Sequence, residues 1–569
     1  MHCKLRAKSS FTATKRRRGS PHPIECGVVS DSADAVELSL FTHRFSAIAR
    51  QMGEMLARTA VSTNVKERLD FSCGVLDARG RLVVNAPHIP VHLGALGLCV
   101  RRVAEAVPME PGDAVVTNHP AFGGSHLPDV TVVTPAFTEE GELLGYLASR
   151  AHHAEIGGVR PGSMPPRATR LEQEGVVIPP VHLVRGGEDR FDEMRRRLTQ
   201  GPHPSRAVEE NLADLAAALA ANRRGVEALK TLALDHGAIT VERYMAALAG
   251  LARKRMAGVL RELPEAVYAA QERLDDGSLL RVRWERGSEG PMASGVVARI
   301  DFTGTAGVHS GNLNAPPAVT RSAVLYVLRL LLGRERPESR DLPLNEGLLE
   351  PVELIIPEGM LNPPFPEDPA DSAGAPAVVG GNVETSQRVV EVLLKALGLV
   401  AGSQGTMNNV LFGTDRVGYY ETVCGGAGAG PDFAGASAVH THMTNTRITD
   451  PEVLEHRYPV RLERFAVRRG SGGAGRFRGG DGAVREITFL EPVSLSVLSQ
   501  HRDRGPYGLE GGEPGSPGRQ RVIRNSEDES KKPEIVDLAA VDECEVEPGD
   551  RLILETPGGG GWGAPEEGS

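Results

Sequence analysis

Histidine and carboxylate residues are concentrated in one stretch of the sequence, residues 115–158, which reads VVTNHPAFGGSHLPDVTVVTPAF…GYLASRAHHAEIGG. Apolar runs typical of strands separate these residues, so their side chains are expected at strand ends and in Gly-rich loops. Such an arrangement is what a metal site or an acid/base site requires. The residues concerned are His119, His126, Asp129, His152, His153 and Glu155.

The spacing of these residues along the sequence limits which of them can share one site. His126 and Asp129 lie in the loop AFGGSHLPD, where Pro128 disfavours a regular helix, so a tight loop should hold the pair. His152 and His153 follow an apolar run, and neighbouring side chains on an extended segment point to opposite faces. Only one of the two can therefore easily face the same centre as His126. The alternative is that His126 and Asp129 merely bond to the loop backbone.

A second carboxylate for such a site comes from outside this stretch. Glu67 in KERLD stands just before the apolar run FSCGVLD, although a solvated charge run is an equally good interpretation. Two imidazoles and two carboxylates would form a mixed nitrogen and oxygen site, which suits Mn²⁺, Fe²⁺ or Zn²⁺ and disfavours a soft-metal or all-oxygen Ca²⁺ site.

Two other motifs could carry chemistry. His440 and His442 alternate in VHTHM on an expected strand, so both should face one side as a second metal candidate. No carboxylate follows them in sequence before Asp450. GGNVETSQ at 380–387 could cradle an anion through backbone N–H groups, but it lacks a Walker lysine, and a tight turn with a helix cap is favoured.

The elements that must position these residues can be read from periodicity. Apolar residues from Leu40 to Leu56, three to five apart, predict a helix. FSCGVLD and RLVVNA predict two strands of a hairpin joined at residues 78–80. Strands are also expected at VTVVTPAF, LLGYLASR and VELIIP, and helices over 205–263, over 318–332 and after GGNVETSQ. The expected fold class is α+β, with mixed multi-layer sheets, a helical middle section and Gly-rich loops.

Five segments are expected from composition. Residues 1–32 should be a disordered basic tail, because KRRR occurs at 15–18 and the first acidic residue is Glu25. Residues 33–200 form a β-rich domain with the metal site, 201–270 a helical segment, and 271–512 an α/β domain with the GNVETSQ and HTH motifs. Residues 513–569 combine a polar, exposed insert over 513–534 with C-terminal strands that end in TPGGGG.

Composition excludes some classes of protein. The 569 residues carry a net charge of −10, so neither nucleic acid nor an anionic membrane is expected as a partner. No apolar run reaches the roughly 18 residues of a membrane span. The six cysteines form no CxxC motif, and Cys73 and Cys99 are expected as buried small side chains. Together these features favour a cytoplasmic protein in a reducing compartment.

Motifs along nearly the whole chain, from about residue 34 to residue 563, resemble the hydantoinase B/oxoprolinase family. They include KERLDFSCGVLDARGRLV, IPVHLGALG, GGSHLPDV, RAHHAEIGG, PGSMPP, GNVETSQR, QGTMNN, VHTHMTNTRITDPEVLE, SGGAGRFRGGDG and TPGGGG. That family includes B subunits of N-methylhydantoinases, the C-terminal half of 5-oxoprolinases and the alpha subunit of acetone carboxylase.

The resemblance implies a metal-dependent B subunit of an ATP-dependent cyclic amidohydrolase that opens 5-oxoproline or a hydantoin. The partner would be a hydantoinase A-type subunit of the actin/acetate-kinase type, which binds ATP and phosphorylates a substrate, so a hetero-oligomer is expected. Carried over from the family, the ligands of the divalent metal (Mn, Fe or Zn) fall on Glu67, His126, Asp129 and His152. A substrate-facing or catalytic role is a guess for His92 in IPVHLG and for His153.

Two alternatives to this function stay open. One is a subunit of an ATP-dependent ketone carboxylase, and the other is a structural subunit whose metal only stabilises the assembly. One departure from the family pattern bears on the substrate. The family has N-D-P-Y where this chain has Asn118-His119-Pro120-Ala121, which changes the local charge by about one unit.

Overall fold

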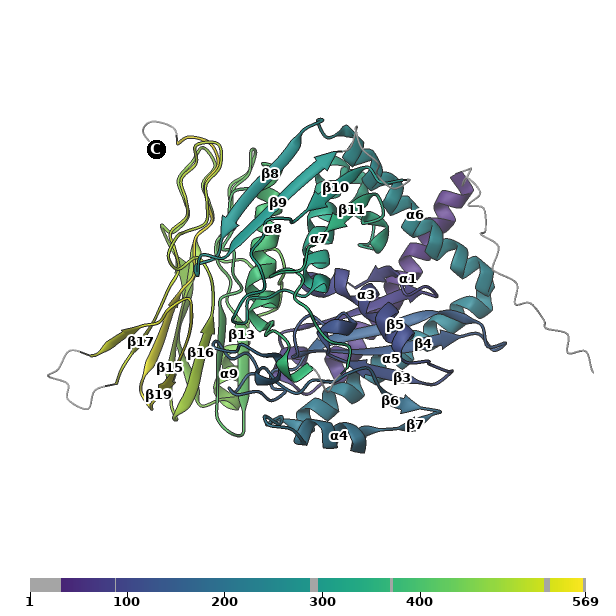
Figure 1. The fold of residues 1–569 in the computed structure, drawn as a ribbon, viewed down its shortest axis with the longest axis horizontal. Coiled ribbons are helices and arrows are strands. Elements are labelled where there is room, and N and C mark those ends of the chain that lie inside the picture. The colour runs from purple at the N-terminus through teal and green to yellow at the C-terminus, as the bar shows by residue number, and fades with distance from the viewer. Residues whose placement is uncertain (1–31, 87–88, 287–294, 369–371, 526–532, 566–569) are drawn as a thin grey trace, which may run out of the picture.

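The computed structural model describes residues 32–86, 89–286, 295–368, 372–525 and 533–565 (Figure 1). The basic tail expected over 1–32 lies outside the described residues, except that the first helix begins at Ser32. Helices and several sheets are combined in layers, which confirms the expected α+β class. Figure 1 shows the C-terminal sheets as one layer beside the rest of the molecule.

A seven-stranded sheet forms the N-terminal part, in the order β2-β1-β5-β4-β3-β6-β7, and all neighbouring strands are antiparallel. The expected hairpin is confirmed as β1 and β2. The strands are β1 (Phe71–Asp77), β2 (Leu82–Asn85), β3 (Ala114–Thr117), β4 (Asp129–Phe137), β5 (Leu143–His152), β6 (Val181–Arg185) and β7 (Glu188–Asp189).

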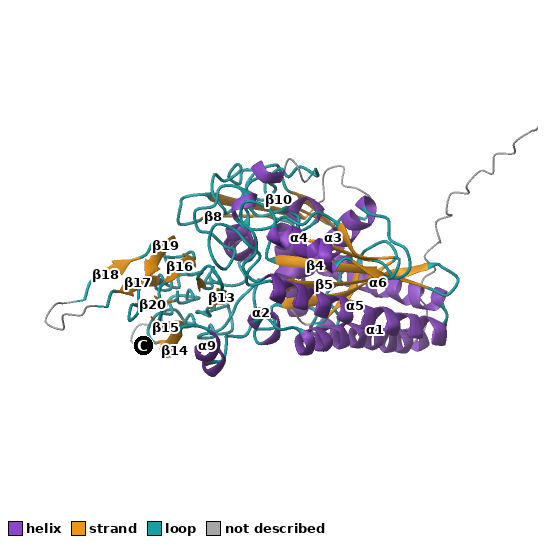
Figure 2. Ribbon diagram, turned by 90° about the horizontal axis from the view of Figure 1, so that it is seen from below, coloured by secondary structure: helices purple, strands orange, loops and turns teal. Residues whose placement is uncertain are grey.

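Both faces of this sheet are covered, because successive residues of β4 enter different cores. Val132 joins the large core that includes helices α1 (Ser32–Thr59) and α5 (Val208–His236), whereas Val133 packs with helix α3 (Pro90–Ala106). Figure 2 shows α1 and α5 along the strands, with α6 (Ala238–Glu262) beside them. The helical segment expected over 201–270 thus packs on one face of the sheet.

The middle of the chain builds a four-stranded sheet, in the order β11-β10-β9-β8, and two buried helices. Helix α7 packs against α3, and α8 packs against α7 and strands β8 and β9. The chain enters α8 through a π-helical turn, η6 (Gly381–Thr385). The other elements are β8 (Val267–Arg273), β9 (Leu279–Arg286), β10 (Ala298–Asp301), β11 (Val352–Ile355), α7 (Pro317–Glu335) and α8 (Ser386–Ala396).

The C-terminal part contains a four-stranded sheet, β13-β12-β16-β19, and a five-stranded sheet, β14-β15-β20-β17-β18. They share a second core, which includes Phe412 and Ile487. The strands are β12 (Asn409–Gly413), β13 (Gly418–Thr422), β14 (Val460–Arg468), β15 (Gly482–Phe489), β16 (Val493–Leu498), β17 (Arg519–Ile523), β18 (Ile535–Asp537), β19 (Val541–Val546) and β20 (Arg551–Glu555).

The prediction of an exposed insert over 513–534 is wrong for the residues of β17. This strand pairs with both β20 and β18, and Val522 is fully buried in the second core. Polar residues at alternate positions are the solvated face of the strand, which composition alone does not distinguish from a loop. Residues 526–532 of the expected insert lie outside the described residues.

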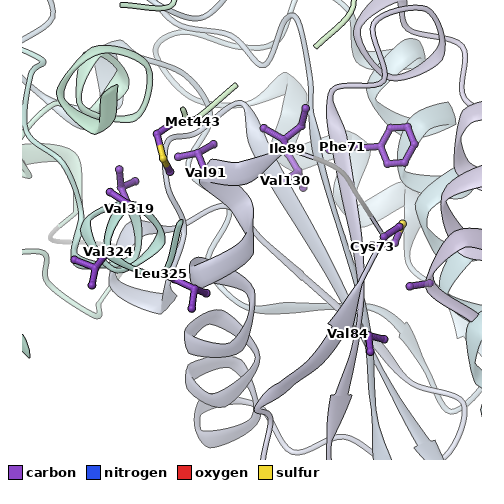
Figure 3. Close-up of a cluster of buried hydrophobic side chains, with 14 of the residues drawn as sticks. Phe71, Cys73, Val84, Ile89, Val91, Val130, Val319, Val324, Leu325 and Met443 are labelled. Carbon is purple, nitrogen blue, oxygen red and sulfur yellow. The ribbon is translucent and has the colours of Figure 1, made fainter. Parts of the chain in front are cut away.

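One continuous core crosses the expected boundaries at 200/201 and 270/271, since it joins residues from α1 to α8. Figure 3 shows this core at the start of α3, where Val91 lies beside Met443. The backbone N–H of Val91 donates to the Met443 carbonyl over 3.2 Å. A segment 352 residues further along the chain thereby reaches the end of the first sheet.

Short helical turns complete the fold: α2 (Thr63–Lys66), α4 (Phe191–Thr199), α9 (Pro451–Arg457), η1 (Pro120–Phe122), η2 (Leu171–Gln173), η3 (Pro337–Ser339), η4 (Glu346–Leu348) and η5 (Ser372–Gly374). Among the described helices, none has the length and apolar character needed to cross a membrane.

Candidate metal centre

Strand register places His152 between two carboxylates at one end of the first sheet. Asp129 opens β4 and pairs with His152, the last residue of β5. Phe71 of β1 pairs with Ala151, so Asp70 falls opposite His152 on the other side, and the His152 N–H donates to the Asp70 carbonyl over 3.0 Å. Residues directly opposite on antiparallel strands point to the same face. The register therefore gathers these three side chains.

The Asp129 carboxylate is surrounded by three imidazoles. One oxygen, Oδ1, lies 3.1 Å from His126 Nε2 and 3.3 Å from His152 Nδ1. The other, Oδ2, lies 3.2 Å from His92 Nε2 and accepts a 2.5 Å hydrogen bond from the Ser125 hydroxyl. These four neighbours come from α3, from the loop before β4 and from the end of β5. All are buried, so the carboxylate has no access to water.

His126, Asp129 and His152 fit a metal ion. Each offers one ligand atom, and these atoms lie within 4.8 Å of one another. His126 Nδ1, His152 Nε2 and Asp129 Oδ1 are buried without a hydrogen-bond partner among the described residues. A buried polar atom left unpaired costs about 1–3 kcal/mol, so Asp129 Oδ1, which faces His126 Nε2 and His152 Nδ1, requires an explanation. A cation bound between these three atoms provides one, and we refer to the three residues as the triad.

The hydrogen bonds around His92 lead to the same conclusion. The Ser72 hydroxyl donates to the Ile89 carbonyl and lies 3.1 Å from His92 Nδ1, so it can accept from Nδ1–H. A neutral His92 with its proton on Nδ1 presents the Nε2 lone pair to Asp129. A lone pair facing a carboxylate is repulsive unless a proton or a metal ion reduces the negative charge.

The charges of the site favour ligand-competent forms. Burial alone would raise the pKa of Asp129, but the neighbouring imidazoles of His126, His92 and His152 hold it well below its ordinary value. Burial lowers the pKa of His152, against the opposing effects of Asp129 and Asp70. An ionised carboxylate beside a neutral imidazole is the form that binds a metal ion.

Tyr420 of β13 holds His152 from the other side. The two rings stack with their centroids 4.6 Å apart. The Tyr420 hydroxyl donates to Asn409 Oδ1 over 3.0 Å, and Asn409 Nδ2 donates to Glu384 Oε1 over 2.7 Å. Burial raises the pKa of Glu384 to about 8. This network connects the triad to the π-helical turn that precedes α8.

A buried arginine joins the KERLD segment to the C-terminal part. The Arg68 guanidinium lies 5.0 Å from the Tyr420 ring centre and donates to the Tyr420 carbonyl. It also donates to the hydroxyls of Thr422 and Thr446 over 3.1 and 3.2 Å, and to the Arg447 carbonyl over 3.2 Å. Arg68 therefore fixes the chain immediately before Asp70.

The expected ligand Glu67 is not brought to the triad. It caps the C-terminus of α2, is half-buried, and lies outside the group of three. Between it and β1, Leu69 adopts the left-handed conformation, with φ of 55°. Because of this reversal, the carboxylate of KERLD whose charge acts on His152 is that of Asp70.

The two adjacent histidines behave as strand alternation predicts. His152 points toward the other two residues of the triad. His153 Nδ1 accepts a 3.1 Å hydrogen bond from Asn211 Nδ2 on α5. His153 is thus placed behind the site, among residues that support the sheet.

His119 also lies outside the triad. Its Nδ1 accepts from the Ala121 N–H over 3.1 Å and caps η1, so its Nε2 carries the proton and donates to Ser372 Oγ over 2.7 Å. Burial lowers its pKa to about 4, which keeps the ring neutral. His119 therefore shapes the loop that leads to His126.

The strand expected at the HTH motif is wrong. Residues 440–443 form an irregular segment with a turn, in which His442 has a left-handed φ of 57°. Alternation therefore does not apply, and burial lowers the pKa of both His440 and His442. Neither residue joins the candidate metal group.

Asn382 in η6 is a site residue that the sequence alone did not identify. Its Nδ2 donates to His126 Nε2 over 3.1 Å. The Gly-rich run of GGNVETSQ does mark a turn before a helix. An anion cradle or a helix cap involves only backbone groups, so neither pattern indicates that the Asn382 side chain reaches His126.

Comparison with known proteins agrees with this fold. The sequence model of the family described as hydantoinase B/oxoprolinase matches residues 34–565. 5-Oxoprolinase 1 from Arabidopsis thaliana is 44% identical over 557 residues, which are 94% of this chain and 42% of that protein. The chain spans less than half the length of this protein and of other curated relatives that it matches, such as the 5-oxoprolinase from Saccharomyces cerevisiae.

Two solved structures share the fold. The crystal structure of the ATP-dependent caprolactamase from Pseudomonas jessenii superposes with a TM-score of 0.80 at 26% identity, over 94% of this chain and 92% of that one. The nucleotide-free acetone carboxylase superposes with a TM-score of 0.78 at 17% identity, over 93% of this chain and 76% of that one, which shows the fold alone.

Proposed function

The chain belongs to the hydantoinase B/oxoprolinase family, and from this premise we propose that it is the metal-dependent component of an ATP-dependent enzyme that opens a cyclic amide. The substrate class is 5-oxoproline or a hydantoin. The name of the 44% identical 5-oxoprolinase 1 supports 5-oxoproline as the first choice.

The observation that carries this proposal is the triad. A divalent Mn, Fe or Zn ion would be held by His126, Asp129 and His152, and it would supply polarisation of the amide carbonyl. For the fourth ligand we propose Asp70 in place of Glu67. Strand register sets Asp70 opposite His152, whereas Glu67 lies on a helix cap.

The remaining residues position the triad. Ser125 donates to Asp129 Oδ2, and His92 Nε2 lies 3.2 Å from the same oxygen, so both contact the carboxylate and limit its orientation. Tyr420 stacks on His152. Such contacts typically change metal affinity or activity by about 10- to 100-fold when removed. His92 is therefore a positioning residue in our proposal. We assign His153 a supporting role instead of a catalytic one, because its Nδ1 accepts a hydrogen bond from Asn211 Nδ2.

ATP would be bound by a hydantoinase A-type component, as a separate subunit or as a further part of a longer chain. The 42% coverage of 5-oxoprolinase 1 leaves room in that protein for such a component. The caprolactamase chain, described as ATP-dependent, is matched over 92% of its length and supports a separate subunit. A hetero-oligomer is the arrangement that we favour.

Carboxylation of a ketone is the second candidate. The acetone carboxylase shares the fold but only 17% of aligned residues, against 44% for 5-oxoprolinase 1. The two reactions differ in the use of bicarbonate, because amide opening consumes water and forms no bond to an added carbon.

The test is reconstitution with the ATP-binding component. The complex is given 5-oxoproline, ATP and ¹³C-bicarbonate, and the product is measured by mass spectrometry. We expect unlabelled glutamate, with ATP consumed in proportion. Label in the product would support the carboxylase. ATP-independent or absent turnover with every cyclic amide, despite intact assembly, would overturn the proposal.

A further inference from the structure

The side-chain amide of Asn382 points into the metal centre with its oxygen unpartnered. Asn382 is 3% exposed, and its Nδ2 lies 3.1 Å from His126 Nε2. Its Oδ1 is buried and has no hydrogen-bond partner among the described residues. A buried amide oxygen without a partner is costly. A ligand or a water molecule must therefore satisfy it.

The backbone holds Asn382 in one place. It lies in the π-helical turn η6, where its N–H donates to the Val378 carbonyl over 3.2 Å and its carbonyl accepts from the Ser386 hydroxyl. A Cβ on the preceding Gly381 would come within 1.8 Å of the Asn314 carbonyl oxygen, so this turn packs directly on a neighbouring backbone. π-Helical turns are frequent at functional sites.

Further unpartnered polar atoms continue from Asn382 along the same helix. Glu384 Oε2 and Gln387 Oε1 are both fully buried and lack partners among the described residues. His126 Nδ1 and His152 Nε2 of the triad also lack partners among these residues. Unpaired buried polar atoms therefore occur both in the segment around Asn382 and in the triad that it contacts, which favours a polar ligand there.

The chemistry of a side-chain amide matches one feature of cyclic amides. A primary carboxamide presents an N–H donor and an oxygen acceptor side by side. In a small lactam the ring holds the amide in the cis form, so its C=O and N–H also lie side by side. A trans amide, which linear peptides adopt, directs them in opposite directions. One carboxamide can therefore pair with both groups of a cyclic amide but not of a linear one.

We propose that Asn382 is a substrate-binding residue that reads the cis amide: its Nδ2–H donates to the ring carbonyl, and its Oδ1 accepts from the ring N–H. This inference rests on the proposed function and specifies which part of the substrate the chain recognises. It also explains how the site discriminates a ring amide from the peptide bonds of other proteins.

The test compares 5-oxoproline with its N-methyl derivative, which keeps the carbonyl and lacks the N–H. Binding is measured by calorimetry on the metal-loaded complex with the ATP-binding component and a non-hydrolysable ATP analogue. For the wild type we expect the N–H compound to bind roughly 10- to 100-fold more tightly, as for other bidentate amide pairs. Asn382→Ala should bind both compounds equally weakly and keep its metal content.

Asn222→Ala is the matched control. Asn222 is also fully buried with an unpartnered Oδ1, but its Nδ2 bonds to the Val132 and Leu147 carbonyls of the sheet. It should keep the wild-type preference for the N–H compound. Asn382→Leu, which keeps a side chain of similar size and lacks both the N–H donor and the oxygen acceptor, provides a second variant if Asn382→Ala does not fold.

The outcomes separate this inference from the proposed function. Equal binding of both compounds to a wild-type complex that turns over 5-oxoproline would overturn the role of Asn382 alone. Retention of the full preference in folded Asn382→Ala or Asn382→Leu would do the same. Absence of both binding and turnover with any cyclic amide, in a metal-loaded assembled complex, would overturn the proposed function and this inference together.

Discussion

Replacing His152 or its neighbour His153 by alanine separates metal binding from folding. Both side chains are almost fully buried at the end of β5, and both variants remove one imidazole from the same place in the sheet. His152 Nδ1 lies 3.3 Å from Asp129 Oδ1, whereas His153 bonds to Asn211 Nδ2 over 3.1 Å. The two variants therefore differ in whether the imidazole that is removed contacts Asp129 or Asn211.

The expected magnitudes follow from these contacts. Structural zinc sites with four ligands contribute about 10–16 kcal/mol, so the loss of one ligand costs about 3 kcal/mol, or about 100-fold in affinity. His152→Ala should show this loss. His153→Ala leaves the Asn211 donor unpaired at a cost of about 1–3 kcal/mol, plus a cavity, without weakening the metal.

The assay is metal content after dialysis against graded chelator, together with urea unfolding of the metal-free proteins. Similar free energies of unfolding for the two metal-free variants, with metal lost at lower chelator from His152→Ala alone, is the expected pattern. Wild-type metal affinity in His152→Ala, or equal loss in both variants, would refute the assignment of His152 as a ligand.

Three further predictions concern the same region. Chelation should lower the melting temperature of the wild type, because a metal at 1,000 times its dissociation constant contributes about 4 kcal/mol; a melt that ignores both chelator and added metal would contradict the site. Asp70→Asn should weaken metal binding by at least about 10-fold and Glu67→Gln should not, as measured by the same dialysis; the reverse order would restore Glu67 as the ligand. Glu384→Gln should flatten the pH dependence of the free energy of unfolding between pH 5 and 8. Burial raises the pKa of Glu384 to about 8 in the fold, so the folded protein holds a proton there that the unfolded chain has released. The stability that this proton contributes is complete at acid pH and is lost as the pH rises through 8, at up to about 1.4 kcal/mol per pH unit. Urea unfolding at pH 5.5 and 7.5 measures this slope, and identical slopes for wild type and variant would show that Glu384 is ionised in the fold.

Local pattern was sufficient for much of the fold. The helix over Ser32–Thr59 and the hairpin of β1 and β2 follow from apolar periodicity, since each buries one regular face. The position of β17 could not be predicted, because a polar alternating strand is recognised only when its sheet partners are known. The order of strands in the sheets depends on such long-range pairing throughout.

The site divides in the same way. Alternation of side chains along a strand predicts that only one of His152 and His153 faces the site, and the choice of His152 came from the family resemblance. His126 and Asp129 need only a short loop. The choice between Glu67 and Asp70 depends on the left-handed backbone conformation of Leu69. Nothing in the sequence KERLD indicates that conformation, because leucine rarely adopts it. Tyr420 and Asn382 reach the site through tertiary packing, and no local signal in the sequence connects them to His126.

The central claim is that the triad performs metal-dependent opening of a cyclic amide. The most direct measurement is the rate of 5-oxoproline opening by the reconstituted complex that contains Asp129→Asn, compared with the wild type. We expect at least about a 100-fold loss of turnover, with the assembly intact and a cooperative unfolding transition. The reason is that the variant removes the carboxylate that both His126 and His152 contact. Wild-type turnover in the assembled Asp129→Asn complex would contradict the account and leave the metal centre with a structural role.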